Sequence, residues 1–412
     1  MNCHLLYIDP GTGSALFSII IGIVATLYFF SRTVIIKLKT YLMGSKSANS
    51  VSAANSYVIY NEGKHYCNVF LPILEEFEKR EINILYLSSA IDDPFFNFPW
   101  RFVKMQYIGE GNRAYAYLNM LKAGICLMTT PGLDVYQLKR SKMTAHYSHV
   151  LHAPTDVTMY KLFGTDYFDS VLLTGDYQAY DIRTLERQRN IPEKKLVTAG
   201  CTYLDVYADK MKSLSIEDSH QFTVLVSPSW GASSLLVLYG EKLLDPLVKT
   251  GFKIIIRPHP QSKKSEPETL SRLESLYGDK LFWDYESENI ISLSKADIMI
   301  SDFSGIVYDY TFLTGKPVIY IMQGIDLRPY DADDLGKNAI ENIWQFKTLK
   351  DIGVELTEDK FNNISVIIEY ALKNKSSQKA RDNAKATAWQ FQGEAGKRIA
   401  DFMIETVNTM GF

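Results

Sequence analysis

Short apolar runs alternate with longer amphipathic stretches over most of this chain of 412 residues. The runs typical of buried strands are 57–60, 82–87, 124–128, 149–151, 171–174, 196–199, 223–226, 253–256, 281–283, 297–300 and 317–321. Helical patterns lie between most of them, for example at 69–79, 178–189, 235–249 and 305–313. Because such alternation is typical of parallel sheets covered by helices on both faces, we predict an α/β fold with two Rossmann-like domains.

The boundary between the two domains is expected where strand signals become sparse, between residues 203 and 220. Small polar residues dominate 46–56, which predicts a flexible tether. The predicted parts are a membrane anchor with a basic segment (1–45), the tether (46–56), a first Rossmann-like domain (57–215), a second one (216–385) and a C-terminal helix (386–412).

The segment Gly11–Phe30 has no charged residue over twenty positions, about the length that crosses a hydrocarbon core as a helix. No acidic residue occurs between Asp9 and Glu62. Four basic residues follow the segment, namely Arg32, Lys37, Lys39 and Lys46. By the positive-inside rule we predict a single-pass helix in the inner (cytoplasmic) membrane, with the catalytic domains in the cytoplasm. The alternative is a helix buried in the protein core.

Charge and cysteine content narrow the possible partners. The formal net charge is −3, so no basic field suggests nucleic acid as a partner. The four cysteines form no CxxC pair, which argues against a zinc site or a redox dithiol. Three histidines lie in HYSHVLHAP, but the two-residue repeat of a strand places His146 and His152 on one face and His149 on the other. We therefore predict no metal site.

Ligands of parallel sheets bind at the carboxyl ends of the strands, where the candidate residues of this chain occur. The strand 253–256 runs into Arg257-Pro258-His259-Pro260. Arginine can form bidentate hydrogen bonds with phosphate, and histidine can bind phosphate or transfer a proton. We predict that Arg257 binds phosphate and that His259 is catalytic, the alternative for His259 being a turn histidine bonded to backbone.

Two further strand ends carry hydroxyl groups and glycine ahead of a helix. Ser301, Asp302 and Ser304 follow the strand 297–300, and Ser229 and Gly231 follow the strand 223–226. Hydroxyl groups and free amides at a helix N-terminus bind anions, although serine and aspartate are also ordinary helix caps. We predict that these five residues bind the phosphate or nucleotide part of a ligand.

His152 stands at the end of the strand 149–151, directly before Ala153-Pro154. A histidine at a strand end is well placed to act as a general base. We therefore predict a catalytic role for His152 in the first domain.

The order of these motifs resembles the CDP-glycerol glycerophosphotransferases of teichoic acid synthesis. The motifs that carry the resemblance, from about Tyr147 to Tyr320, are His152-Ala-Pro, FDSVLLTG, VTAGCTYLD, SPSWG, RPHP and SDFSGIVYDYTFLTGKPVI. The family usually has glycine where Ala153 stands and a second hydroxyl where Gly305 stands. About half of the chain is covered, residues 57–146 fit only by general pattern, and the apolar N-terminal segment is not a general feature of the family.

The resemblance implies a GT-B-like pair of domains, with the acceptor on the first and a CDP-alcohol donor on the second. It implies that an acceptor hydroxyl attacks phosphorus and that CMP leaves. His152 then looks like the family's base, and Arg257 and His259 look like its pyrophosphate-binding pair. The residues that look like its donor loop are Ser301, Asp302 and Ser304. No acidic pair has metal-ligand spacing, so we expect no metal and no cofactor besides the CDP-polyol substrate.

The leading hypothesis is transfer of a polyol phosphate, with glycerol phosphate first, from a CDP-activated donor to a hydroxyl of a lipid-linked or cell-surface polymer. A first alternative is a glycosyltransferase of the same fold that uses a nucleotide sugar. A second alternative is a membrane-anchored protein that binds a polymer without catalysis.

Overall fold

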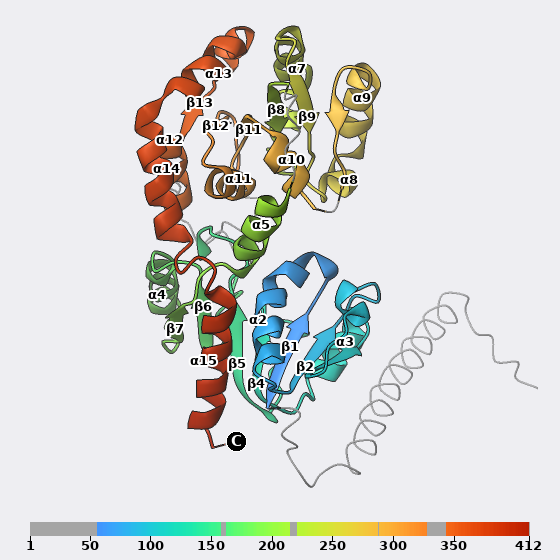
Figure 1. Cartoon of the computed structure of the whole chain (residues 1–412), viewed down its shortest axis with the longest axis vertical. Helices are drawn as coiled ribbons and strands as arrows, with labels where there is room; N and C mark the ends of the chain where they lie inside the picture. Colours follow the sequence, from blue (N-terminus) through green and yellow to red (C-terminus); the bar gives the residue numbers. More distant parts are fainter. Residues whose placement is uncertain (1–55, 158–161, 215–220, 287, 328–342, 412) are drawn as a thin grey trace, which may run out of the picture. The chain divides into compact units, whose positions relative to one another are not determined.

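The computed structural model describes residues 56–157, 162–214, 221–286, 288–327 and 343–411. Two parallel sheets organise them (Figure 1). The first sheet has the order β3-β2-β1-β4-β5-β6-β7 and the second has the order β10-β9-β8-β11-β12-β13. Every strand pair in both sheets is parallel. Each sheet reverses its order beside its first strand, where ligands of such folds bind.

The first sheet contains β1 (Tyr57–Asn61), β2 (Ile84–Ser88), β3 (Val103–Tyr107), β4 (Ala123–Met128), β5 (Thr144–Val150), β6 (Ser170–Leu173) and β7 (Lys195–Thr198). Its helices are α2 (Cys67–Lys79), α3 (Asn112–Leu118) and α4 (Gln178–Arg189), and α5 (Thr202–Ser213) leads out of it. A short 3-10 turn, η3 (Lys64–Tyr66), precedes α2.

The second sheet contains β8 (Thr223–Val226), β9 (Lys253–Ile256), β10 (Phe282–Trp283), β11 (Ile298–Ser301), β12 (Val318–Tyr320) and β13 (Gly353–Glu355). The helices that follow these strands are α6 (Leu235–Leu238), α7 (Gly240–Lys249), α8 (Ser262–Ser265), α9 (Pro267–Tyr277), α10 (Ile290–Lys295), α11 (Ile306–Thr314), α12 (Trp344–Ile352) and α13 (Ile364–Lys373).

The central strands are made of buried aliphatic residues, and this explains where the sequence patterns succeeded. β8 and β9 begin and end at the predicted residues, as does α4. Two edge strands, β3 and β13, were not predicted. β3 contains Lys104 and Gln106 and is mostly half-buried or exposed, so it has no continuous apolar run.

The C-terminal part forms two helices, α14 (Lys375–Ala388) and α15 (Ala395–Thr409). α14 packs against α12 and α11 beside the second sheet, whereas α15 packs against α2 beside the first (Figure 1). The segment between them crosses the ends of β6 and β7. A Cβ at Gly175 would lie 2.1 Å from the Thr387 carbonyl oxygen, and one at Gly200 would lie 2.5 Å from that of Gln390. The glycines after both strands therefore allow this crossing.

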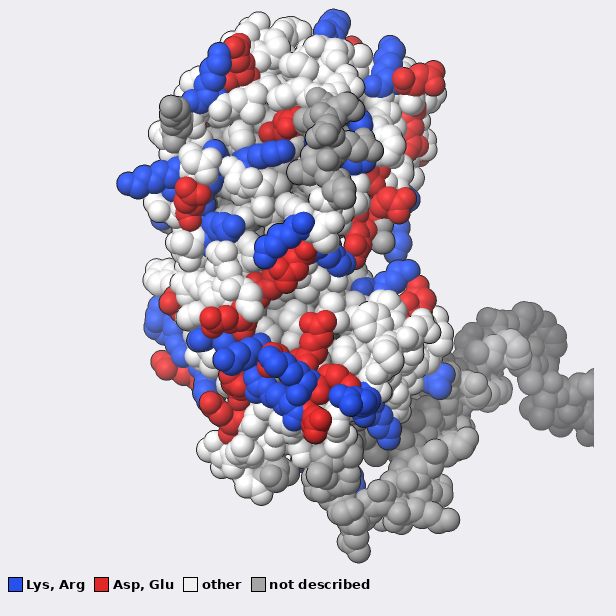
Figure 2. All heavy atoms as spheres, in the orientation of Figure 1, with Lys and Arg blue, Asp and Glu red and all other residues white. Residues whose placement is uncertain are grey.

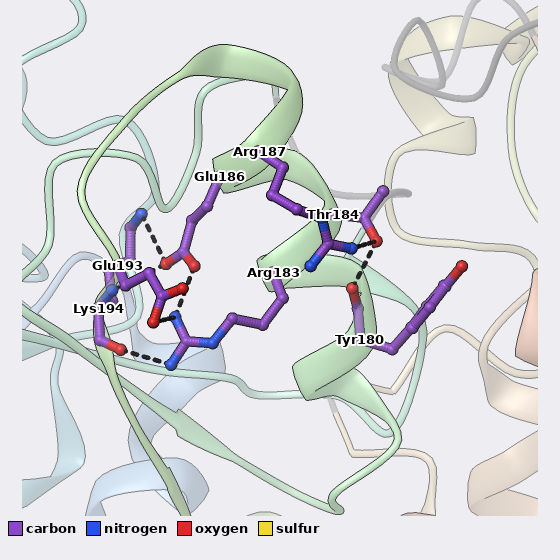
Figure 3. Close-up of polar contacts among 7 residues, drawn as sticks. All are labelled: Tyr180, Arg183, Thr184, Glu186, Arg187, Glu193 and Lys194. Atoms are coloured by element: carbon purple, nitrogen blue, oxygen red, sulfur yellow. Dashed lines mark hydrogen bonds and ion pairs between the residues drawn. The ribbon is translucent and has the colours of Figure 1, made fainter.

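Buried charges attach α4 to β7 (Figure 3). The Glu186 carboxylate accepts hydrogen bonds from the Arg183 guanidinium at 2.5 Å and from the Lys194 amide at 2.8 Å. The Lys194 ammonium lies 3.3 Å from the same carboxylate, and both side chains are 3% exposed. Because each buried charge has an opposite partner, the cluster is compatible with the apolar surroundings.

The visible surface has a mixed charge pattern. Figure 2 shows lysine and arginine side chains interspersed with aspartate and glutamate over this face of the molecule. Exposed ion pairs also occur on the surface, such as Lys64 with Asp92 at 2.6 Å. Exposed pairs of this kind contribute little to stability.

The predicted membrane span Gly11–Phe30 lies outside the described residues. Among the residues that the structure does describe, no helix has both the length and the apolar character needed to cross a membrane.

Candidate active site

A cavity of about 660 Å³ lies at the carboxyl ends of the strands of both sheets. The turns after β5, β8, β9 and β11 all contribute to its lining. It brings together five of the predicted residues from these four turns: His152, Ser229, Arg257, His259 and Ser304. Residues far apart in sequence thus meet where the parallel-sheet rule places a ligand.

His152 lies two residues beyond the end of β5. Its Nδ1 is 3.4 Å from the Thr129 hydroxyl, and the edge of its ring meets the Tyr66 ring at a centroid distance of 5.0 Å. Burial, and secondarily the nearby His65, lowers the pKa of His152 to about 4. The imidazole is therefore neutral at pH 7 and able to accept a proton.

Arg257 follows β9 and is held rigidly. Its guanidinium donates to the Asp284 carboxylate at 2.5 Å and to the Glu286 carbonyl at 2.7 Å. Only 9% of the residue is exposed, and it lines the cavity. A guanidinium has five N–H donors, so it can bind phosphate while it keeps these two contacts.

His259 is oriented by the turn in which it lies. The Gln261 amide donates to its Nδ1 at 3.1 Å, so in the neutral tautomer the proton is on Nε2. The ring centroid lies 6.3 Å from that of Trp230. Burial lowers the pKa of His259, and the nearby Glu266 carboxylate opposes this effect. His259 is thus bonded to backbone through Nδ1, as the alternative for a turn histidine stated, and its side chain also lines the cavity.

The N-terminal end of α11 faces the cavity through Ser304, Gly305 and Ile306. A Cβ at Gly305 would lie 3.2 Å from Cγ2 of Thr155, so the turn after β5 approaches the start of α11 closely. The nine-residue helix directs the positive end of its dipole toward this space, while the Val307 and Tyr308 amides donate to the Ser304 and Gly305 carbonyls at 3.3 and 3.0 Å. The arrangement suits an anion next to the His152 turn.

Ser301 and Asp302 are fully buried beneath the cavity wall. The Ser301 hydroxyl donates to the Ser227 carbonyl at 2.5 Å. The Asp302 carboxylate accepts from the amides of Ser229, Leu235 and Ser304 at 2.9 to 3.1 Å, and from the Ser229 hydroxyl at 2.9 Å. Burial raises the pKa of Asp302 to about 6 although these donors oppose it. In this structure Asp302 joins the turn after β8 to the turn after β11.

Gly231 also has an internal partner. Its amide donates to both oxygens of the Glu266 carboxylate, at 3.2 and 3.1 Å. Its φ of +81° belongs to the left-handed region that favours glycine. The Gly231 amide, which the sequence predicted as a hydrogen-bond donor to phosphate, therefore already donates to Glu266.

Several lining residues were not predicted as site residues. They are His65, Tyr66 and Asn68 at the start of α2, Tyr203 and Tyr207 on α5, Asp309 on α11 and Gln345 on α12. No short motif marks them. His65 and Tyr66 come from the 3-10 turn η3 that follows β1, and the others come from helix faces. Within the described residues, no group of three or more His, Cys, Asp or Glu side chains is arranged to hold a metal ion.

A family model described as CDP-Glycerol:Poly(glycerophosphate) glycerophosphotransferase matches residues 172–404. The chain belongs to this family. It is thus a transferase of the CDP-glycerol glycerophosphotransferase type. The matched range includes Arg257, His259 and the start of α11, whereas His152 lies before it. No match was found among curated proteins.

Solved structures share the whole two-domain arrangement. The wall teichoic acid polymerase TagF is 15% identical, with 93% of this chain and 98% of that chain covered and a TM-score of 0.58. A putative UDP-N-acetylglucosamine 2-epimerase from Listeria monocytogenes is 12% identical, with 86% and 97% covered and a TM-score of 0.57. At such identities the likeness establishes the fold, which is GT-B-like.

Proposed function

We propose that the protein transfers glycerol phosphate from CDP-glycerol to a hydroxyl of a lipid-linked or cell-surface polymer of the teichoic acid type. The observation that supports this most is the single cavity in which His152 faces Arg257, His259 and the start of α11. Family membership supports the donor class. A TagF structure obtained with CDPG belongs to a protein of the same fold.

The proposed reaction needs one base and a set of charge-stabilising groups. The acceptor oxygen attacks the phosphorus that carries glycerol, and His152 takes the proton of this hydroxyl. The bond between that phosphorus and the bridging oxygen breaks, and CMP leaves with the electron pair. Arg257 and Nε2–H of His259 stabilise the charge on the pyrophosphate, as does the positive dipole end of α11.

Donor binding provides the decisive test. The purified full-length chain is titrated by calorimetry with CDP-glycerol, CDP-ribitol, CDP, UDP and UDP-N-acetylglucosamine. We expect tight binding of a CDP-polyol that is lost in His259→Ala and retained in His146→Ala, since His146 lies outside the cavity lining. A preference for the UDP-sugar would identify a glycosyltransferase, and binding of none of these compounds would support a non-catalytic protein.

We also propose that Gly11–Phe30 anchors the enzyme in the cytoplasmic membrane, with its domains beside a lipid-linked acceptor on the cytoplasmic side. Its uncharged length and the basic residues after it support this proposal. Removal of residues 1–45 should transfer the protein from the membrane fraction to the soluble fraction of the cell. Persistence in the membrane fraction would contradict the anchor. The domain bounds 57–215, 216–385 and 386–412 stay predictions, which limited proteolysis can test.

A further inference from the structure

One wall of the cavity contains polar groups that the proposed chemistry does not use. Tyr203 and Tyr207 lie four residues apart on α5, and Asp309 lies on α11. The Tyr203 hydroxyl donates to the Asp309 carboxyl, and Asn68 at the start of α2 lines the same cavity as Tyr207. Three helices thus bring two phenols, one amide and one carboxyl to the same wall.

The position of this wall relates it to the reacting phosphorus. Gly305 and Ile306, at the proposed phosphate site, line the cavity together with Asp309. Residues three and four apart share one face of a helix, so Asp309 lies about one turn (about 5 Å) beyond the phosphate site. A short polyol attached to that phosphorus, or one that attacks it, can reach this distance.

The chemistry of the wall fits hydroxyl groups better than phosphate. Burial raises the pKa of Asp309 well above its usual range, which favours the protonated form, and a protonated carboxyl offers both a donor and an acceptor. The phenols and the amide also donate and accept, as a hydroxyl requires. None of these four side chains is a cation, in contrast to Arg257 on the phosphate side.

We propose that Asp309, together with Tyr203, Tyr207 and Asn68, forms a subsite that recognises the hydroxyl groups of a polyol in the cavity. This subsite rests on the proposed function, because the polyol is the transferred group or the acceptor. Tyr277 and Asp245 provide an internal comparison. They form a similar tyrosine–aspartate hydrogen bond of 2.6 Å, but neither residue lines the cavity.

The test compares CDP-glycerol with CDP-propanol, which lacks the two hydroxyls, in calorimetry on the full-length chain. We expect the wild type to prefer CDP-glycerol and Asp309→Leu to lose about tenfold in this preference. The affinity of Asp309→Leu for CDP should equal that of the wild type, which would also show that the variant is folded. Asp309→Asn, which keeps a donor and an acceptor, should retain the preference. Tyr277→Phe and Asp245→Asn should behave as the wild type.

The source of the hydroxyls is decided by a second readout. If Asp309→Leu keeps the donor preference but raises KM for a poly(glycerol phosphate) acceptor about tenfold, the subsite binds the acceptor polyol. The proposal is wrong if Asp309→Leu changes neither the preference for CDP-glycerol nor the KM for the acceptor. It is also wrong if Tyr277→Phe changes these two quantities as much as Asp309→Leu does. Tyr203→Phe replaces Asp309→Leu in these comparisons if the latter does not fold. If the wild type binds neither CDP nor CDP-glycerol, the proposed function fails first and the subsite fails with it.

Discussion

The two walls of the cavity hold their polar groups in different ways. On the side of the second sheet, Arg257, His259 and the start of α11 are each fixed by hydrogen bonds inside the protein. On the side of the first sheet, His152 lies against the Tyr66 ring, and its Nδ1 is 3.4 Å from the Thr129 hydroxyl.

This contrast corresponds to two different chemical tasks. A wall of fixed donors stabilises the charge of a phosphate or pyrophosphate without reorganising during the reaction. A base must instead be unprotonated before it accepts a proton. With a pKa of about 4, His152 is neutral at pH 7, and it is a weaker base than a histidine with a pKa near 7. The second wall thus offers charge stabilisation, and the first offers a neutral acceptor.

The largest expected effect separates these tasks at His152. His152→Ala should lower kcat by about 100- to 10,000-fold, since the general base is removed. Affinity for CDP-glycerol should change little, because the donor contacts belong to the opposite wall. Steady-state kinetics and calorimetry measure the two quantities, and His146→Ala is the matched control. Turnover close to the wild type would show that His152 is not the base.

A smaller effect is expected from the buried acid that supports the opposite wall. Asp302→Ala should lower the free energy of unfolding by about 3 kcal/mol, because several buried donors lose their acceptor. The same change at Asp209, whose side chain is 77% exposed, should cost less than about 0.5 kcal/mol.

Urea unfolding measures both variants, and CDP affinity should fall in the folded fraction of Asp302→Ala. If Asp302→Ala is as stable as Asp209→Ala, Asp302 does not support this wall. If it is stable but no longer binds CDP, Asp302 acts directly on the donor, as the sequence suggested.

The second wall could be predicted from the sequence, because its residues follow apolar strands in short motifs. β8 and β9 are four-residue runs that end at SPSWG and RPHP, so strand, turn and chemistry are adjacent in the chain. The contacts of Asp302 with Ser229 and Leu235 were beyond prediction. They join turns about seventy residues apart, and no local pattern records such a pairing.

The first wall was less predictable apart from His152, since its other polar residues come from the η3 turn and from helix faces. His65 and Asn68 belong to the entry of α2, where they look like ordinary surface residues. Asp309, on the side of the second sheet, lies inside α11, where no strand-end motif marks it. Edge strands such as β3 were missed because polar, half-exposed residues interrupt the apolar pattern by which a buried strand is predicted.

The smallest expected effect concerns the contact that joins the two walls. Asp156, after β5, accepts hydrogen bonds from the Trp344 and Gln345 amides at 3.0 and 2.7 Å, and Gln345 lines the cavity. Burial, and secondarily the charge of Asp181, raises the pKa of Asp156 to about 7. The proton is therefore bound more tightly in the folded state than in the unfolded state. The stability that it contributes is complete below about pH 4 and is lost as the pH rises through about 7.

Asp181→Asn should reduce this pH dependence, because the neutral side chain no longer opposes ionisation of Asp156 and can still accept from the Val157 amide. Between pH 6 and pH 8 the wild type should lose on the order of 1 kcal/mol more stability than the variant. Urea unfolding at the two pH values measures this, and the comparison cancels His149 and His152, which are present in both proteins. Equal losses in the two proteins would mean that the Asp181 charge does not raise the pKa of Asp156. Burial alone would then account for the pH dependence of this contact between the walls.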